Sequence, residues 1–124
     1  MVIGSRESEG AKRYDESVSR HLRGRVFNLV VRLLAVGRFQ DTQCGFKCFR
    51  SAAAEQIFSS QRTVGFGFDV ELLYLSAKKS LRVLEMPIEW HHQNMSTVRF
   101  IDAFLMFRDV FMVRIRDFRG DYRQ

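Results

Sequence analysis

The stretch "DTQCGFKCFR", residues 41–50, is the most distinctive of the chain, because it mixes a carboxylate, an amide, thiols, cations and a glycine-aromatic pair. It is too polar for a core strand and too irregular for one face of a helix. Cys44 and Cys48 form neither a zinc quartet nor a disulfide framework, and no second Cys/His pair stands at metal spacing. The pattern predicts a loop that passes into a short strand at residues 45–49, with two free thiols that serve as packing residues.

Apolar periodicity on both sides of this loop predicts an alternation of strands and helices. Before it, residues 1–5 indicate a buried strand that ends in a glycine turn, residues 6–17 a polar loop, and residues 17–36 a helix. After it, we expect helices over 51–58 and 68–79, a strand over 81–90 and a long helix over 99–119. Pro87 predicts an edge position or a break in that last strand. This order is an α/β pattern.

Size and charge limit the function further. With 124 residues, 46% of them hydrophobic, the chain is large enough for one small domain with a core. Lys and Arg number 20 against 14 acidic residues, which points to an anionic partner: nucleic acid, a membrane or phosphates. The arginines of residues 20–38 lack an RNA-binding signature or an aromatic run, so nucleic acid is disfavoured. No window approaches the roughly 18 apolar residues of a spanning helix.

Polar groups gather beside glycines or element ends at residues 4–6, 41–47, 68–71 and 91–98, which are usual positions for sites in α/β domains. "GSR" offers backbone N–H groups, a hydroxyl and a guanidinium, which suit a phosphate; an ordinary turn with a solvated Arg6 is the alternative. Asp69 and Glu71 point about 200° apart on a helix, so only one of them faces a site. Glu71 fits a structural salt bridge equally well. His91 and His92 are more typical of a solvated loop.

"GSR", "DTQCGFKCF", "GFDVELLYL", "EMPIEW" and "STV" occur in the order and spacing of one family. The chain resembles, over almost all its length, the second half of the dolichyl-phosphate β-glucosyltransferases, which are family 2 glycosyltransferases. The resemblance implies the C-terminal half of a GT-A fold, an incomplete Rossmann-like sheet with flanking helices. Residues 1–98 would form the acceptor-side half of the catalytic domain, and residues 99–124 an amphipathic, membrane-interfacial helix.

The resemblance implies transfer of glucose from UDP-glucose to dolichyl phosphate, on the cytosolic face of the endoplasmic reticulum membrane, for protein N-glycosylation. Such enzymes bind Mg²⁺ or Mn²⁺ through an Asp-x-Asp motif in their first half. This chain has no Asp-x-Asp, so we expect the metal ligands to lie outside it and the chain alone to be inactive. Phe66 and Ser96-Thr97 depart from the family's usual Trp and "SK". A related polyprenyl-phosphate sugar transferase, or a truncated non-catalytic membrane-surface module, remains open.

The acceptor phosphate is already ionised at neutral pH, so its attack needs no strong base, but holding it near a sugar nucleotide needs cations. We therefore expect the acceptor phosphate to be bound by Arg6, Arg20 and Arg23. Catalytic or orienting roles fall to Asp41 and Asp69. Substrate-binding roles fall to Ser5, Gln43, Lys47 and Arg99, the last as a stand-in for the missing cation of "SK".

Overall fold

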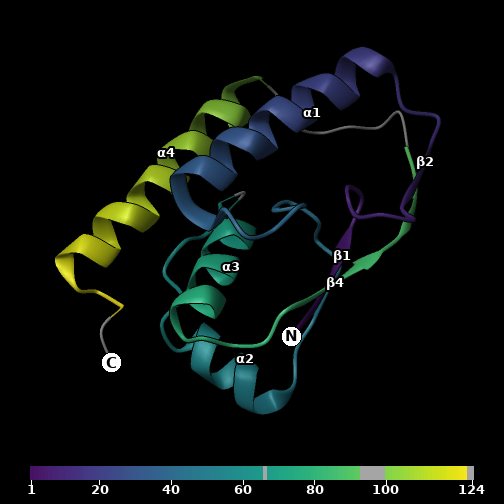
Figure 1. Cartoon of the computed structure of the whole chain (residues 1–124). Helices are drawn as coiled ribbons and strands as arrows, with labels where there is room; N and C mark the ends of the chain where they lie inside the picture. The colour runs from purple at the N-terminus through teal and green to yellow at the C-terminus, as the bar shows by residue number, and fades with distance from the viewer. Residues whose placement is uncertain (66, 93–99, 123–124) are drawn as a thin grey trace.

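The computed structural model describes residues 1–65, 67–92 and 100–122, and in it a small mixed sheet is flanked by helices (Figure 1). Helices α1 and α4 lie side by side, α3 lies between them and the sheet, and α2 lies at the far end (Figure 1). The elements are β1 Val2–Ser5, β2 Lys12–Tyr14, α1 Val18–Val31, η1 Arg32–Val36, β3 Lys47–Cys48, α2 Ser51–Phe58, α3 Phe68–Lys78, β4 Leu84–Pro87, β5 Glu89–His91 and α4 Phe100–Arg119. The predicted α/β class is confirmed.

The main sheet has the order β3-β1-β4, with β3 antiparallel and β4 parallel to β1. The strand expected over 81–90 is divided, because Pro87 ends β4 and the chain then pairs with another sheet as β5. The predicted break at Pro87 is therefore confirmed, and β4 is also an edge strand. The strand expected over 45–49 is shorter than predicted, since only Lys47 and Cys48 pair with β1.

The polar loop expected over residues 6–17 was wrong in part, because Lys12–Tyr14 form strand β2. β2 pairs in parallel with β5, with Arg13 opposite Trp90. The helix expected over 17–36 is confirmed, but its last turn, Arg32–Val36, is a π-helix. The other predicted helices agree with α2, α3 and α4 to within a residue.

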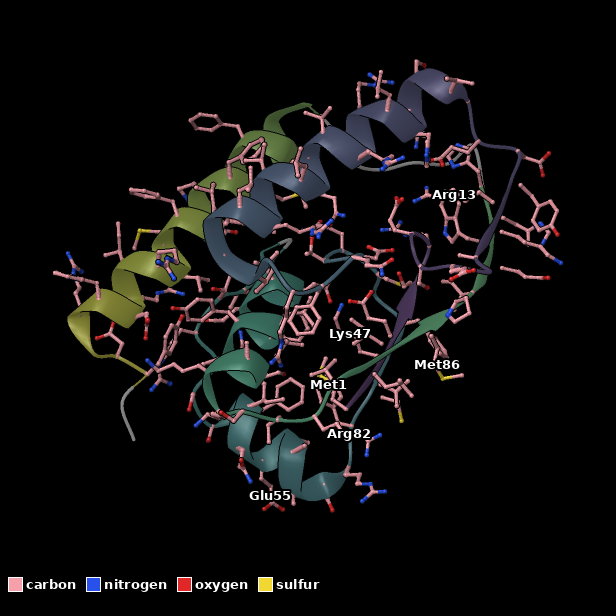
Figure 2. All side chains as sticks on the ribbon, viewed as in Figure 1. Met1, Arg13, Lys47, Glu55, Arg82 and Met86 are labelled. Atoms are coloured by element: carbon pink, nitrogen blue, oxygen red, sulfur yellow. The ribbon has the colours of Figure 1, made fainter. Side chains whose placement is uncertain are left out.

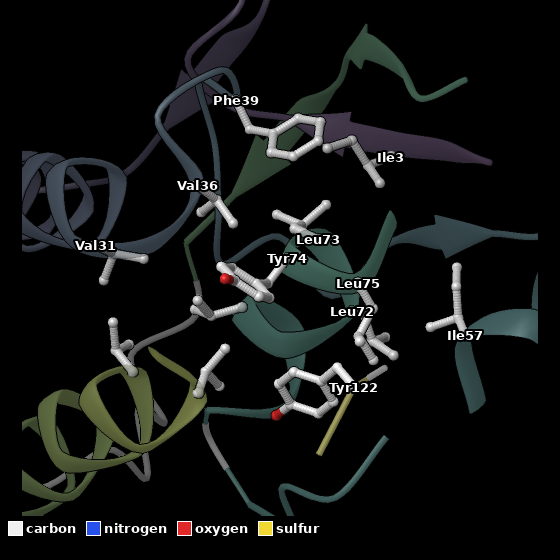
Figure 3. Close-up of a cluster of buried hydrophobic side chains, with 13 residues drawn as sticks. Ile3, Val31, Val36, Phe39, Ile57, Leu72, Leu73, Tyr74, Leu75 and Tyr122 are labelled. Carbon is white, nitrogen blue, oxygen red and sulfur yellow. The ribbon is translucent and has the colours of Figure 1, made fainter. Parts of the chain in front are cut away.

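The core surrounds α3 (Figure 3). All residues from Val70 to Ser76 are buried, so this helix is enclosed on every side rather than along the single face that its spacing indicates. Around it pack apolar side chains from β1, η1, α2, α4 and the segments beside them: Ile3, Val36, Phe39, Ile57, Val110, Val113 and Tyr122. Because α3 is fixed from all directions, its first turn is a rigid support for polar groups.

Helix α4 turns part of its polar stripe inward. Asp109 is buried against Gly67, where an added Cβ would come within 2.3 Å of the Asp109 Cβ. Arg116 reaches Thr63 with a hydrogen bond of 2.8 Å. On the outside, Phe104, Phe111 and Phe118 are 68%, 59% and 89% exposed. Among the helices of the described segments, none has the length and hydropathy needed to span a bilayer.

Candidate functional site

The side chain of Asp41 is the centre of a polar cluster at the carboxyl end of β1. It is 2% exposed and forms a salt bridge with Arg6, whose Nε and Nη2 donate to its two oxygens at 2.7 and 3.0 Å. The backbone N–H groups of Arg6 and Gln43 donate to the same carboxylate at 3.0 and 3.1 Å. A carboxylate with this many donors is fixed in orientation, and so is the guanidinium that it holds.

The charges of this pair are stabilised against their own burial. Burial alone lowers the pKa of Arg6 and raises that of Asp41, but the hydrogen bond and the opposite charge outweigh it. The net result is a pKa of Asp41 below, and a pKa of Arg6 above, their usual values. The Arg6 guanidinium also lies 5.8 Å from the centroid of the Trp90 ring. Both groups are therefore charged at neutral pH.

The loop that carries Asp41 is anchored to helix α1 through Asn28. The Asn28 side-chain oxygen accepts from the backbone N–H and the hydroxyl of Thr42, at 3.0 and 2.7 Å, and its amide nitrogen donates to the Gln40 carbonyl. Thr42 is fully buried. The position of Asp41 thus depends on α1, although no local signal in residues 41–50 indicates it.

A second charged pair joins the same loop to the start of α3. Lys47 Nζ donates to Asp69 Oδ1 at 2.6 Å and also to the Cys44 carbonyl. The Lys47 side chain is 4% exposed and Asp69 is 26% exposed, so the lysine is enclosed while the carboxylate reaches solvent. Figure 2 shows Lys47 in the interior, between α3 and the strands. Asp69 lies in the first turn of α3, where the helix dipole favours its charge.

Of the other residues predicted to form the site, some lie near the Arg6–Asp41 pair and others do not. Ser5 is fully buried, and its hydroxyl oxygen accepts from the N–H groups of Glu7 and Ser8, which closes the turn after β1. Gln43 is half-buried beside Asp41. Arg20 and Arg23 lie on the first turns of α1, and within the described residues no hydrogen bond or ion pair joins either of them to Arg6 or Asp41. Arg99 lies outside the described residues.

Sequence reasoning missed several members of this cluster. Arg13 lies on β2 (Figure 2). It donates to the Arg6 carbonyl at 3.3 Å and pairs with Glu7 and Glu16. Trp90 was assigned only to a strand, although it underlies the Arg6 guanidinium. The only sequence signal for Arg13 was its positive charge in "KRY". That charge points to the cluster only once β2 is known to pair with β5.

Glu71 holds the structure together rather than facing a site. It is fully buried and accepts from the N–H groups of Arg62 and Thr63 at 2.9 and 2.6 Å, and from the Tyr122 hydroxyl. Arg116 lies 3.5 Å away. Of the two carboxylates at the start of α3, Asp69 is the one that reaches solvent.

The two cysteines have different surroundings. Both are free thiols; Cys44 is buried beside Gly4 and fits the predicted packing role, but Cys48 is exposed. The packing role predicted for Cys48 was therefore wrong, because the short strand β3 turns its side chain outward. Within the described residues, no group of three His, Cys, Asp or Glu side chains is placed to hold a metal ion, so these residues do not fit a divalent-metal site.

Comparison with known proteins gives the cluster a context. The dolichyl-phosphate beta-glucosyltransferase of Saccharomyces cerevisiae is 38% identical over 98 residues, which are 78% of this chain and 29% of that protein. The protein of the same name from Homo sapiens is 35% identical over 98 residues, again 78% of this chain and 30% of that protein. The chain is homologous to part of the dolichyl-phosphate beta-glucosyltransferases. This confirms the resemblance predicted from the sequence.

The homology to these glucosyltransferases extends over nearly all of the chain in three proteins of Trichomonas vaginalis. Dolichyl-phosphate beta-glucosyltransferase ALG5C of Trichomonas vaginalis is 32% identical over 116 residues, 93% of this chain and 34% of that protein. The chain thus spans about a third of the length of the curated relatives it matches. No protein-family model and no solved structure matches it.

Proposed function

We propose that this chain is the acceptor-side part of a glycosyltransferase that moves glucose from UDP-glucose to dolichyl phosphate, for protein N-glycosylation. The 38% identity over 98 residues with the S. cerevisiae dolichyl-phosphate beta-glucosyltransferase carries this proposal. On this proposal the chain is the C-terminal half of a GT-A domain. A mixed sheet with flanking helices supports that assignment.

In the proposed reaction, Arg6 binds the acceptor phosphate. Nε and Nη2 of Arg6 are used by Asp41, while Nη1 has no hydrogen-bond partner among the described residues. Because Asp41 fixes the guanidinium plane, these remaining N–H groups point in a defined direction and bind a phosphate oxygen without first being ordered. Asp41 therefore acts by positioning Arg6, and Gln43 lies next to it. Arg20 and Arg23 add positive charge from the first turns of α1.

Asp69 is the carboxylate available to the reacting groups. Lys47 holds one of its oxygens at 2.6 Å, and the side chain remains 26% exposed. In this proposal Asp69 orients the sugar or the phosphate, and the hydrogen bond from Lys47 holds its side chain in place. A divalent cation, Mg²⁺ or Mn²⁺, would neutralise the donor pyrophosphate in the whole enzyme. The described residues of this chain do not fit such an ion.

Exposed apolar side chains support contact with a membrane, as expected for transfer to a lipid at the cytosolic face of the endoplasmic reticulum. Phe104, Phe111 and Phe118 are spaced by seven residues, which places them along one outer line of α4. Arg108, Arg114 and Arg119 flank this line with positive charge. Such a helix fits the interfacial layer, with arginines near anionic headgroups.

The same surface favours the second candidate function, a non-catalytic membrane-surface module. Co-sedimentation with vesicles that contain phosphatidylserine tests the surface itself. A Phe104→Ser, Phe111→Ser double variant is expected to lose most binding, whereas Phe58→Ser, which also removes a partly exposed phenylalanine but from α2, is expected to retain it. Equal binding by all three proteins would exclude α4 from the membrane contact.

Catalysis is tested in a chimera, in which this chain replaces the segment of the S. cerevisiae enzyme that it matches. We expect the chimera to form glucolipid from radiolabelled UDP-glucose and dolichyl phosphate. Arg6→Ala should raise the KM for dolichyl phosphate about tenfold or more, and the KM for UDP-glucose much less, because it removes a charge-assisted phosphate contact.

The control in the chimera is Arg50→Ala, an exposed arginine before α2 that should leave both KM values unchanged. A general loss of folded protein lowers the maximal rate but leaves both KM values unchanged. A change in the ratio of the two KM values therefore reports a change in phosphate binding. A folded chimera that forms no glucolipid would contradict the proposed function.

A further inference from the structure

A cleft of about 390 Å³ lies between α1 and the segment that precedes Asp41. Its lining includes Arg25, Arg32 and Asn28 of α1 and η1, with Glu7 and Gln40 opposite. The volume falls within the range of about 300–1,000 Å³ that is usual for small-molecule sites. None of the roles assigned above uses Arg25 or Arg32.

The cleft presents cations that the protein only partly satisfies. Arg25 and Arg32 are seven residues apart and lie on the same side of the helix. Arg32 Nε is buried without a hydrogen-bond partner among the described residues, and Nη2 of the same side chain makes only a long contact of 3.5 Å to the Gly37 carbonyl. A buried guanidinium N–H without an acceptor is uncommon, because its lost hydration is not replaced. An anion in the cleft would supply the acceptor.

The acidic residue of the cleft does not cancel this positive charge. Glu7 forms a salt bridge with Arg13, and its second oxygen is 4.0 Å from Arg25 Nε. Glu7 is therefore paired mainly with Arg13, and its contact with the largely exposed Arg25 is long. Asn28 is fixed by three hydrogen bonds to the loop, so its side chain forms a fixed wall of the cleft.

The apolar part of the lining indicates what kind of anion fits. Val26 and Leu29 line the cleft and are 56% and 51% exposed. They continue an exposed apolar stripe of α1 and η1 that has helical spacing and consists of Val18, Leu22, Val26, Leu29 and Leu33. A soluble phosphate would use the arginines alone and leave this stripe in water. A molecule with a phosphate head and an apolar tail would cover both.

We infer that this cleft binds the phosphate head of a lipid through Arg25 and Arg32, with the lipid's apolar tail along the α1 stripe. The inference rests on the proposed function in one respect, because the lipid phosphate bound in the cleft belongs to the same chemical class as the proposed acceptor. It adds a second phosphate site beside the Arg6–Asp41 pair, since Glu7 and Gln40 of the cleft are the sequence neighbours of that pair. A lipid held there would have its head next to the proposed acceptor site.

Farnesyl phosphate, farnesol and inorganic phosphate are the probes, titrated against the isotope-labelled chain below the aggregation concentration of the lipid. We expect farnesyl phosphate to bind, to shift the side-chain Nε–H signals of Arg25 and Arg32, and to bind more tightly than either farnesol or phosphate. An Arg25→Gln, Arg32→Gln double variant should weaken it at least about tenfold, because two charge-assisted contacts are lost. A Val26→Ser, Leu29→Ser variant should weaken farnesyl phosphate but not inorganic phosphate.

Arg50→Gln, which removes the same charge from the opposite end of the molecule, should leave the affinity unchanged. The inference is overturned if farnesyl phosphate does not bind, if the Arg25→Gln, Arg32→Gln variant binds it as the parent does, or if Arg50→Gln weakens it equally. If farnesol binds as tightly as farnesyl phosphate, the site is merely apolar. If inorganic phosphate binds as tightly as farnesyl phosphate, the site is one for free phosphate. Either result also overturns the inference. Glucosyl transfer by the chimera is measured separately, so a failure of the cleft is distinguishable from a failure of the proposed function.

Discussion

Removal of Arg6 tests whether the buried pair with Asp41 holds the site together. Asp41 is 2% exposed, and Arg6→Ala removes its two side-chain hydrogen bonds of 2.7 and 3.0 Å. Breaking a buried ion pair from one side costs about 3–5 kcal/mol, because the remaining charge is left uncompensated. Two backbone N–H donors stay with the carboxylate, and the Arg6 side chain is 23% exposed, so the low end, about 3 kcal/mol, is expected.

Urea unfolding followed by circular dichroism at pH 7 measures this loss, for Arg6→Ala, Asp41→Ala and the double variant. We expect the double variant to lose about 2 kcal/mol less than the sum of the single ones, because the second substitution removes a charge that is already unpaired. Arg23→Ala, which changes an exposed arginine of α1, should stay within about 0.5 kcal/mol of the parent.

The pH dependence of the Arg6→Ala effect follows from the lowered pKa of Asp41. A group whose pKa is lower in the folded protein stabilises it above the ordinary Asp value of about 3.9. That contribution is lost as the pH falls through the folded pKa. The difference in stability between parent and Arg6→Ala should therefore be full at pH 7 and shrink in acid. A coupling energy below about 0.5 kcal/mol at pH 7, or the same difference at pH 2, would refute this reasoning.

Two further predictions concern packing and accessibility. Gly67→Ala should cost about 1–3 kcal/mol in thermal or urea unfolding, because its Cβ would meet that of Asp109 at 2.3 Å and force α3 and α4 apart. Gly24→Ala, with nothing within 4 Å inside α1, should instead stabilise by about 0.5–1 kcal/mol; the same sign for both would argue against the contact. In the folded chain a maleimide should modify the exposed Cys48 and spare the buried Cys44, and equal rates for the two thiols would contradict the burial.

The long helices were predictable from the sequence because their signal is local. The spacing in residues 68–79 and 99–119 predicted helices that the structure places at Phe68–Lys78 and Phe100–Arg119. The break at Pro87 was equally local, since proline lacks the N–H that a strand needs. In contrast, β2 has three residues, two of them cationic, and it exists because β5 lies beside it. Nothing in the sequence of residues 12–14 alone indicates that they pair with residues 89–91.

The pairing of site residues was beyond the reach of sequence patterns. Arg6 and Asp41 were each selected because a charged residue stood beside a glycine or opened a polar loop. Their mutual salt bridge joins positions 35 residues apart, and the Lys47–Asp69 bond spans 22. Such contacts depend on how β1, the loop and α3 meet. The sequence therefore predicted these charged residues as candidates, but not that the anions would hold the cations.

The inward turn of α4 has a similar cause. A helical repeat shows that Asp109 and Arg116 share a face with each other, but not whether the polar or the apolar face is buried. The absence of a side chain at Gly67 makes room for Asp109, and the buried carboxylate of Glu71 gives Arg116 a partner. These two complementary features lie some forty residues earlier in the chain. They leave Phe104, Phe111 and Phe118 exposed on the outer face of α4.

The carboxylates of this chain thus divide according to what surrounds them. Glu71 and Asp41 are buried, and each accepts from backbone N–H groups as well as from a cation, so each fixes the path of a loop. Asp69 has a cationic partner but also reaches solvent. A buried carboxylate that is fully hydrogen-bonded has no free lone pair for a substrate, whereas a partly exposed one does. On the proposed function, Asp69 and the edge of Arg6 that lacks a hydrogen-bond partner among the described residues are therefore the groups that meet the substrate, and Asp41 acts through Arg6.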